Sequence, residues 1–153
     1  MSRFLVSIIL ALSFSASGHA NVTPEDTVKA LFDAMRAGDG AGIRKITTAD
    51  ARLDRLRLNG RIQTGSLEGW IRWVDTLEVN EADEQTFGVQ TLSASPEFAT
   101  VWAPFTIRIK GELKGCGINQ FTLAKTAEGW RIVYGIDIPR ETNCETYPDQ
   151  FSK

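Results

Sequence analysis

The chain has 153 residues, 42% of them hydrophobic, and 17 Lys and Arg against 19 Asp and Glu give a formal net charge of −2. This length and composition predict one domain with a single core, and the near-neutral charge gives no indication of nucleic acid or an anionic membrane as a partner. The only histidine is His19, close to the N-terminus. The domain that follows has no imidazole for a Ser–His or Cys–His nucleophile pair and cannot assemble the usual zinc site, so we expect neither a metal nor a cofactor.

The first 20 residues have the order of a secretory signal peptide. Arg3 gives a basic start, an apolar run extends from Phe4 to Phe14, and small residues follow up to Ala20. The apolar run is too short to cross a bilayer as a helix. We therefore expect cleavage after Ala20, export to the periplasm or full secretion, and a single mature domain over residues 21–153 with no membrane span.

The first half of the mature chain has a helical period. Thr23-Pro24-Glu25-Asp26 is a capping box with proline in the first turn, and Gly38 ends the helix that follows. One face of this helix carries four apolar residues: Val28, Leu31, Phe32 and Met35. A shorter helix is predicted at Ala41–Ile46. A third helix begins after Ser66, and its inward set is Leu67, Trp70, Ile71, Val74 and Leu77.

Strands dominate the rest of the chain. Asn59-Gly60 favours a tight turn and predicts a short hairpin between Ala51–Leu58 and Arg61–Thr64. From about Glu84 onward no helical period remains, and four strands are predicted at Thr86–Leu92, Phe98–Lys110, Ile118–Lys125 and Trp130–Ile138. The turns between them are predicted at Ser95–Glu97, Gly111–Gly117 and Thr126–Gly129. Helices followed by a strand meander predict an α+β fold with the helices on one face of an antiparallel sheet.

Two stretches of the sequence resemble a known superfamily. They are Leu31–Asp39, with the sequence LFDAMRAGD, and Cys116–Leu123 continued by Gly129–Val133. In this order they resemble the nuclear transport factor 2-like superfamily, and most closely its exported SnoaL-like or lumazine-binding-like branch. The resemblance implies a cystatin-like α+β roll, in which a cone-shaped, curved antiparallel sheet wraps round the N-terminal helices and opens at one end into a pocket. It also implies a homodimer that pairs through the sheet.

The two cysteines, Cys116 and Cys144, are predicted to form a disulfide, because thiols of an exported chain are normally oxidised. If the last two strands pair through the turn at Thr126–Gly129, residue 118 lies near residue 138. A short return of the tail then brings Cys144 within the Cα separation of roughly 4.4–6.8 Å that a disulfide requires. Two free thiols, or one catalytic thiol, are the alternatives.

Two carboxylates are candidates for a site. Asp137 lies in a nearly unbroken apolar strand, where a carboxyl group can act as an acid or a base. Strand alternation, however, groups Asp137 with Arg131, Val133 and Gly135 on a face that we expect to be solvated. Asp54 is either a carboxylate at the mouth of the pocket or part of an ordinary charged strand.

Amide and aromatic side chains complete the candidate pocket. Asn119 alternates in phase with Phe121, so its amide would be buried and bonded to either the backbone or a ligand. Trp73 lies off the apolar stripe of its helix and Trp102 lies on the more polar face of its strand, which suits either a pocket wall or a dimer interface. The candidate pocket residues are Asn119, Phe121, Trp73, Trp102, Phe105, Asp54 and Asp137.

The sequence favours a non-catalytic, exported domain that binds a small apolar or aromatic molecule, because it contains no clear acid–base–nucleophile set. The alternative is an isomerase-, dehydratase- or cyclase-type enzyme that uses Asp54 or Asp137 with Tyr134 or Arg57 as its partner. A third hypothesis is an accessory protein whose sheet docks another chain. Two titratable groups that converge inside the pocket would favour the enzyme, and a dry cavity would exclude it.

Overall fold

The computed structural model describes residues 22–140 and 143–151, so the predicted signal peptide lies outside the described residues. Three helices come early in the chain: α1 (Pro24–Ala37), α2 (Gly40–Lys45) and α3 (Leu67–Val74). The strands are β1 (Thr47–Leu56), β2 (Ile62–Gln63), β3 (Ala82–Thr86), β4 (Gln90–Ser95), β5 (Phe98–Ile109), β6 (Glu112–Thr126) and β7 (Gly129–Arg140). A short 3₁₀ helix, η1 (Tyr147–Phe151), follows β7. In this part of the chain no helix has the length and apolar character needed to cross a membrane.

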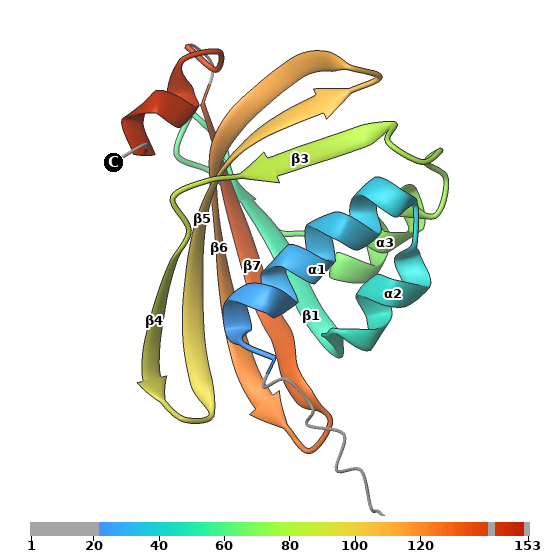
Figure 1. Cartoon of the computed structure of the whole chain (residues 1–153), viewed down its shortest axis with the longest axis vertical. Coiled ribbons are helices and arrows are strands. Elements are labelled where there is room, and N and C mark those ends of the chain that lie inside the picture. Colours follow the sequence, from blue (N-terminus) through green and yellow to red (C-terminus); the bar gives the residue numbers. More distant parts are fainter. Residues whose placement is uncertain (1–21, 141–142, 152–153) are drawn as a thin grey trace, which may run out of the picture.

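One curved, open sheet packs against the helices (Figure 1). Its strand order is β2-β1-β7-β6-β5-β3, and β4 also pairs with β5. β3 pairs with Phe105–Ile109 and β4 with Phe98–Trp102, so the two strands lie at opposite ends of β5. The sheet is antiparallel, as predicted, except at one strand pair, where β1 runs parallel to β7. A tight turn forces the two strands that it connects to run antiparallel. β1 and β7 are far apart in the sequence and are not joined by such a turn, so they can pair in parallel.

The capping box at the start of α1 forms as the sequence predicts. Thr23 Oγ1 accepts a hydrogen bond from the Asp26 backbone N–H at 3.1 Å, and the Asp26 carboxylate accepts one from the Thr23 N–H at 2.9 Å. Gly38 ends the helix with a φ of 68°, in the left-handed region that suits glycine. The predicted apolar face is buried in the core and consists of Val28, Leu31, Phe32 and Met35.

Two strand boundaries differ from the prediction. The expected single strand at Thr86–Leu92 is wrong, because β3 ends at Thr86 and β4 begins at Gln90. Gly88, with a φ of 56°, lies between them and turns the chain. The expected turn at Gly111–Gly117 is also wrong, because β6 already begins at Glu112. Cross-strand pairing with β5 therefore extends through a stretch whose side chains lack an apolar alternation.

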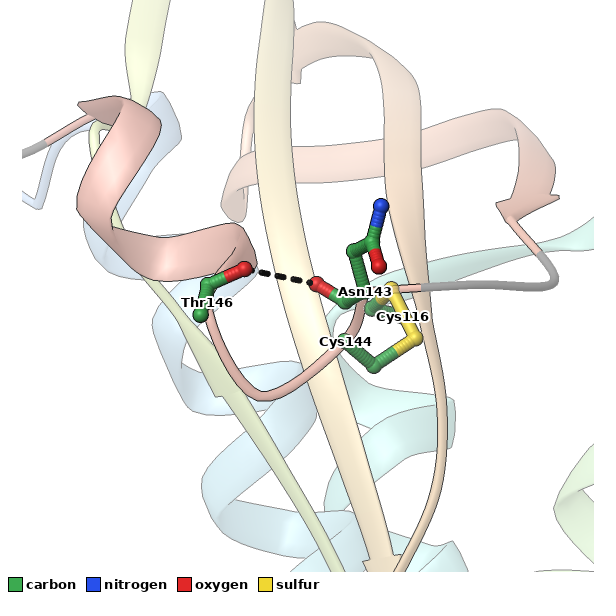
Figure 2. The surroundings of a disulfide bond; sticks show 4 residues. All are labelled: Cys116, Asn143, Cys144 and Thr146. Atoms are coloured by element: carbon green, nitrogen blue, oxygen red, sulfur yellow. Dashed lines mark hydrogen bonds between the residues drawn. A yellow bond between two sulfur atoms is a disulfide. The ribbon is translucent and has the colours of Figure 1, made fainter.

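The predicted disulfide is present, with Cα atoms of Cys116 and Cys144 5.3 Å apart (Figure 2). As expected, Ile118 and Ile138 lie opposite each other in the β6–β7 pair. The bond ties the segment that carries η1 to β6. There the rings of four aromatic side chains contact one another, with centroids 5.2–5.8 Å apart: Phe87, Trp102, Tyr147 and Phe151.

Candidate functional site

A cavity of about 220 Å³ lies between α1, α3 and the face of the sheet that the helices cover. Nine of its thirteen lining residues are apolar: Leu31, Phe32, Met35, Leu53, Leu67, Trp70, Trp73, Ile107 and Phe121. The other four are Arg55, Glu84, Asn119 and Asp137. An apolar wall with a few converging polar groups is the usual composition of a small-molecule site.

The four polar side chains form a line across the sheet, which we call the polar row. Arg55 on β1 lies beside Asp137 on β7, and Asp137 lies beside Asn119 on β6. Glu84 on β3 completes the row, because its Oε1 accepts a hydrogen bond from Asn119 Nδ2 at 2.5 Å. Strand pairing therefore sets the order of Arg55, Asp137 and Asn119, and a hydrogen bond places Glu84 beside Asn119.

Arg55 and Asp137 form a charged pair inside the cavity. Arg55 Nε donates to Asp137 Oδ1 and Oδ2 at 2.8 and 2.7 Å, and Arg55 Nη2 also bonds Oδ2. The hydrogen bond to Asp137 raises the pKa of Arg55. Asp137 is only 8% exposed, and a carboxylate at such a position requires a partner to offset its lost hydration. The two charges cancel, so the pair contributes no net charge to the cavity.

Glu84 has the most perturbed carboxyl group of the site. Burial raises its pKa from 4.5 to about 8; the hydrogen bond from Asn119 and the charge of Arg55 oppose this rise, and the charge of Asp137 adds to it. Glu84 is therefore mostly protonated at pH 7. Within the described residues, Glu84 Oε2 has no hydrogen-bond partner. The Tyr147 hydroxyl is the only polar side-chain atom of these residues that is both fully buried and without a partner. Glu84 Oε2 is therefore unpaired but not fully enclosed.

Glu84 also reaches a second hollow, of about 350 Å³, between α1 and β3. Arg36 on α1 holds β3 in place at this point. Its Nε donates to Asp83 Oδ1 at 2.7 Å, and its Nη2 donates to the Glu84 carbonyl oxygen at 3.3 Å. Glu84 thus lines both the apolar cavity and a polar outer hollow.

Four of the seven predicted pocket residues line the cavity: Asn119, Phe121, Trp73 and Asp137. The expectation that Asp137 faces solvent is wrong, and a β-bulge is the reason. Thr122 pairs with Tyr134 while the next residue, Leu123, pairs with Ile132, which leaves Val133 as the extra residue of β7. The bulge shifts the alternation by one position, so Ile132 and Asp137 both face inward.

The other three predicted pocket residues do not line the cavity. Trp102 contacts Phe151, with ring centroids 5.8 Å apart, and Phe105 is buried elsewhere. Asp54 is 3% exposed on the face of β1 opposite to Arg55, where it accepts hydrogen bonds from three donors: the Gly65 N–H at 3.1 Å, Arg52 Nη2 at 2.6 Å and the Tyr134 hydroxyl at 3.3 Å. The suggested Asp54–Tyr134 pair thus exists, but outside the cavity.

Glu84 and Trp70 are the residues that the sequence reasoning missed as parts of a site. Glu84 was missed because the strand was expected to begin two residues later, at Thr86. An extension of that strand back to Ala82 would have placed Glu84 in phase with Ala82, which is fully buried. Trp70 was expected only in the core; it packs against the core and also lines the cavity.

The described residues contain no group of three or more His, Cys, Asp and Glu side chains that could hold a metal ion. The site offers an apolar enclosure with four aromatic side chains and a row of hydrogen-bonding groups. An open, curved sheet around α1 with such a cavity defines a domain with the nuclear transport factor 2-like, cystatin-like fold.

Sequence comparison gives the family. Residues 19–135 match the model of the family described as "Putative lumazine-binding", which covers most of the chain. The protein belongs to this family. Among curated proteins, none matches the chain significantly.

Solved structures share the fold at low sequence identity. A nuclear transport factor 2-like protein of unknown function from Silicibacter pomeroyi has a TM-score of 0.59 and 18% identity over 76% of this chain and 92% of its own. The association domain of C. elegans CaMKII has a TM-score of 0.59 and 14% identity over 72% and 88%. A "putative aromatic ring hydroxylase" from Novosphingobium aromaticivorans has a TM-score of 0.60 and 14% identity over 77% and 87%. These identities establish the fold alone.

Proposed function

We propose that this protein is an exported domain that binds a small molecule in the cavity beneath α1 and α3. The observation that carries the proposal is the combination of nine apolar lining residues with the polar row, in which two hydrogen-bonded pairs lie side by side. The apolar wall would bury the body of a ligand, and the polar row would orient it. The cavity, at about 220 Å³, is smaller than the pockets of roughly 300–1,000 Å³ that hold drug-sized molecules, so the ligand is small.

The family description makes lumazine the first probe to test. Lumazine is a flat, bicyclic molecule with carbonyl groups, and the cavity presents the rings of Trp70 and Trp73 with centroids 6.5 Å apart. The rings supply flat apolar surface against which a planar ligand can pack. We propose that a flat heterocycle or aromatic molecule occupies this space.

The test is an NMR titration of the mature protein with lumazine at pH 6.5, in which the indole N–H signals of the tryptophans are followed. We expect shifts at Trp70 and Trp73, and an affinity about ten-fold weaker in Trp73→Ala. Trp102→Phe is the matched control, because Trp102 lies outside the cavity, and it should bind as the wild type does. If neither lumazine nor a screen of flat fragments shifts Trp70 or Trp73, the proposal is wrong.

An acid–base enzyme of the isomerase, dehydratase or cyclase type is the second candidate, and Glu84 is the observation that favours it. Glu84, whose pKa burial raises to about 8, shares one cavity with a second carboxyl group, that of Asp137, and acid–base catalysis uses such pairs of titratable groups. In this candidate Glu84 takes the role that the sequence suggested for Asp54. The test is proton exchange of the acetophenone methyl group in D₂O. Exchange that the wild type accelerates and Glu84→Gln does not would support catalysis.

Export and self-association are further proposals. The disulfide supports export, and a mass that begins at Asn21 and is two hydrogens below the thiol form would support cleavage after Ala20. For a homodimer through the sheet, the support is Ile138, which is 37% exposed on the face opposite to that of the buried Asp137. Light scattering of the wild type should give twice the mass of the monomer. Ile138→Glu should give the mass of a single monomer.

A further inference from the structure

We infer that the cavity selects an uncharged ligand with a flat apolar body and a carbonyl-type acceptor, which Glu84 binds by donating its carboxyl proton. This inference rests on the proposed binding function and names the chemical class of the ligand. Three features support it: the charge balance of the cavity, the hydrogen bond that Asn119 makes to the Glu84 carboxyl group, and the small number of other charged groups around Glu84.

The charge balance disfavours ionic ligands. Arg55 donates to both oxygens of Asp137, so an anionic ligand would have to compete with Asp137 for the guanidinium. An anionic ligand that took Arg55 would leave the Asp137 carboxylate, which is 8% exposed, without its partner, and an unpaired buried charge is costly. A cationic ligand would find no unpaired carboxylate while Glu84 keeps its proton. An uncharged ligand disturbs neither group.

The hydrogen bond from Asn119 determines which oxygen of Glu84 carries the proton. Asn119 Nδ2 is a donor, and it contacts Glu84 Oε1 at 2.5 Å. Oε1 therefore acts as the carbonyl oxygen of the acid, and the hydroxyl is on Oε2. Oε2 has no partner among the described residues and is not fully enclosed, and Glu84 lines the cavity, so this hydroxyl can donate to a ligand. The complementary ligand atom is a hydrogen-bond acceptor such as a carbonyl oxygen.

Few charged groups other than the Arg55–Asp137 pair lie around Glu84, which lines both the cavity and the outer hollow. Asp137 and Arg55 lie in the cavity, and α3 and β5 contribute only apolar side chains to it. On the α1 side, the charged groups of the hollow are paired: Lys29 with Asp33 at 2.5 Å, and Arg36 with Asp33 at 2.9 Å and with Asp83 at 2.7 Å. Binding should therefore follow the ionisation of Glu84.

The test uses three probes of equal size and different charge: acetophenone, benzoate and benzamidinium. Binding to the mature protein is followed at the indole N–H signals of Trp70 and Trp73, at pH 6.5 and at pH 9.5. Acetophenone should bind most tightly at pH 6.5 and weaken by about ten-fold or more at pH 9.5, because ionised Glu84 has no proton to donate. Benzamidinium should change in the opposite direction.

Variants identify the residue that titrates. Glu84→Gln keeps an acceptor for Asn119 and an amide donor, so it should bind acetophenone with no dependence on pH over this range. Glu97→Gln changes an exposed carboxyl group in the β4–β5 turn and should behave as the wild type does. The comparison of the two pH values in the wild type does not depend on whether either variant folds.

The possible failures are distinguishable. Tighter binding of benzoate or benzamidinium at pH 6.5, or equal binding of acetophenone at both pH values, would overturn the inference and leave the binding function intact. Retention of the pH dependence in folded Glu84→Gln would also overturn it. If none of the three probes, and no lumazine, shifts Trp70 or Trp73, the proposed binding function itself fails, together with this inference.

Discussion

Replacement of Glu84 by glutamine should stabilise the protein above pH 5 and flatten the dependence of its stability on pH. Folding raises the pKa of Glu84 from 4.5 to about 8, mainly through burial. Between these two values the folded state holds a proton that the unfolded state has released. The free energy of unfolding must therefore fall as pH rises through this window, because the unfolded state binds fewer protons than the folded state.

The expected magnitude follows from the size of the window. One pKa unit corresponds to about 1.4 kcal/mol, so stability should fall by about 3 kcal/mol between pH 5 and pH 7.5. The carboxyl groups of Asp33 and Asp83, whose pKa values are lowered in the folded state, are ionised in both states above pH 5 and add no slope here. Glu84→Gln has nothing to deprotonate and keeps its acceptor for Asn119, so its stability should be nearly constant.

Urea denaturation followed by tryptophan fluorescence at half-unit steps from pH 5 to pH 8 measures both curves. Glu97→Gln serves as the control for the loss of one exposed carboxyl group and should keep the wild-type slope. Parallel curves for the wild type and Glu84→Gln would refute the reasoning, because they would show that Glu84 ionises alike in the folded and unfolded states.

Four further changes have defined outcomes. Replacement of both Cys116 and Cys144 by serine should cost about 3–4 kcal/mol in urea denaturation, as expected for a bond that closes 28 residues; equal midpoints with and without reductant would contradict this. Thr23→Ala removes the capping box and should cost about 1 kcal/mol by the same assay. Asp137→Asn removes a charge that raises the pKa of Glu84, so carboxyl ¹³C NMR should show Glu84 titrating at lower pH; an unchanged midpoint would argue against the coupling. Trp73→Ala, at a side chain that is 40% exposed, should weaken probe binding and leave the free energy of unfolding in urea denaturation within about 1 kcal/mol of the wild type.

The fold was predictable because local and long-range signals agree. The capping box at Thr23, the apolar face of α1 and the stop at Gly38 each specify the same helix. In β5 and β7 the apolar alternation is long, so each strand is identified correctly even when its predicted ends are off by a few residues. The disulfide was predictable from two separate arguments. Thiols of a chain expected to be exported are normally oxidised, and the tight turn between β6 and β7 places Ile118 opposite Ile138.

The site was less predictable because it depends on pairings that no local pattern encodes. Asp137 was assigned to the wrong face because the bulge at Val133 moves every residue after it to the other side. Glu84 was missed because β3 is short, is rich in polar residues, and is determined as a strand by its pairing with β5. The bond between Asn119 and Glu84 joins residues 35 positions apart, and only the curvature of the sheet brings them together.

A crystal structure of the mature protein with acetophenone at pH 6.5 tests the central claim most directly. The account predicts that the probe lies between α1, α3 and the sheet, with its ring against Trp70 or Trp73. Its carbonyl oxygen should lie at a hydrogen-bond distance of roughly 2.5–3.0 Å from Glu84 Oε2. A probe bound outside the cavity, or one inside it with its oxygen directed at Arg55 and away from Glu84, would contradict the account.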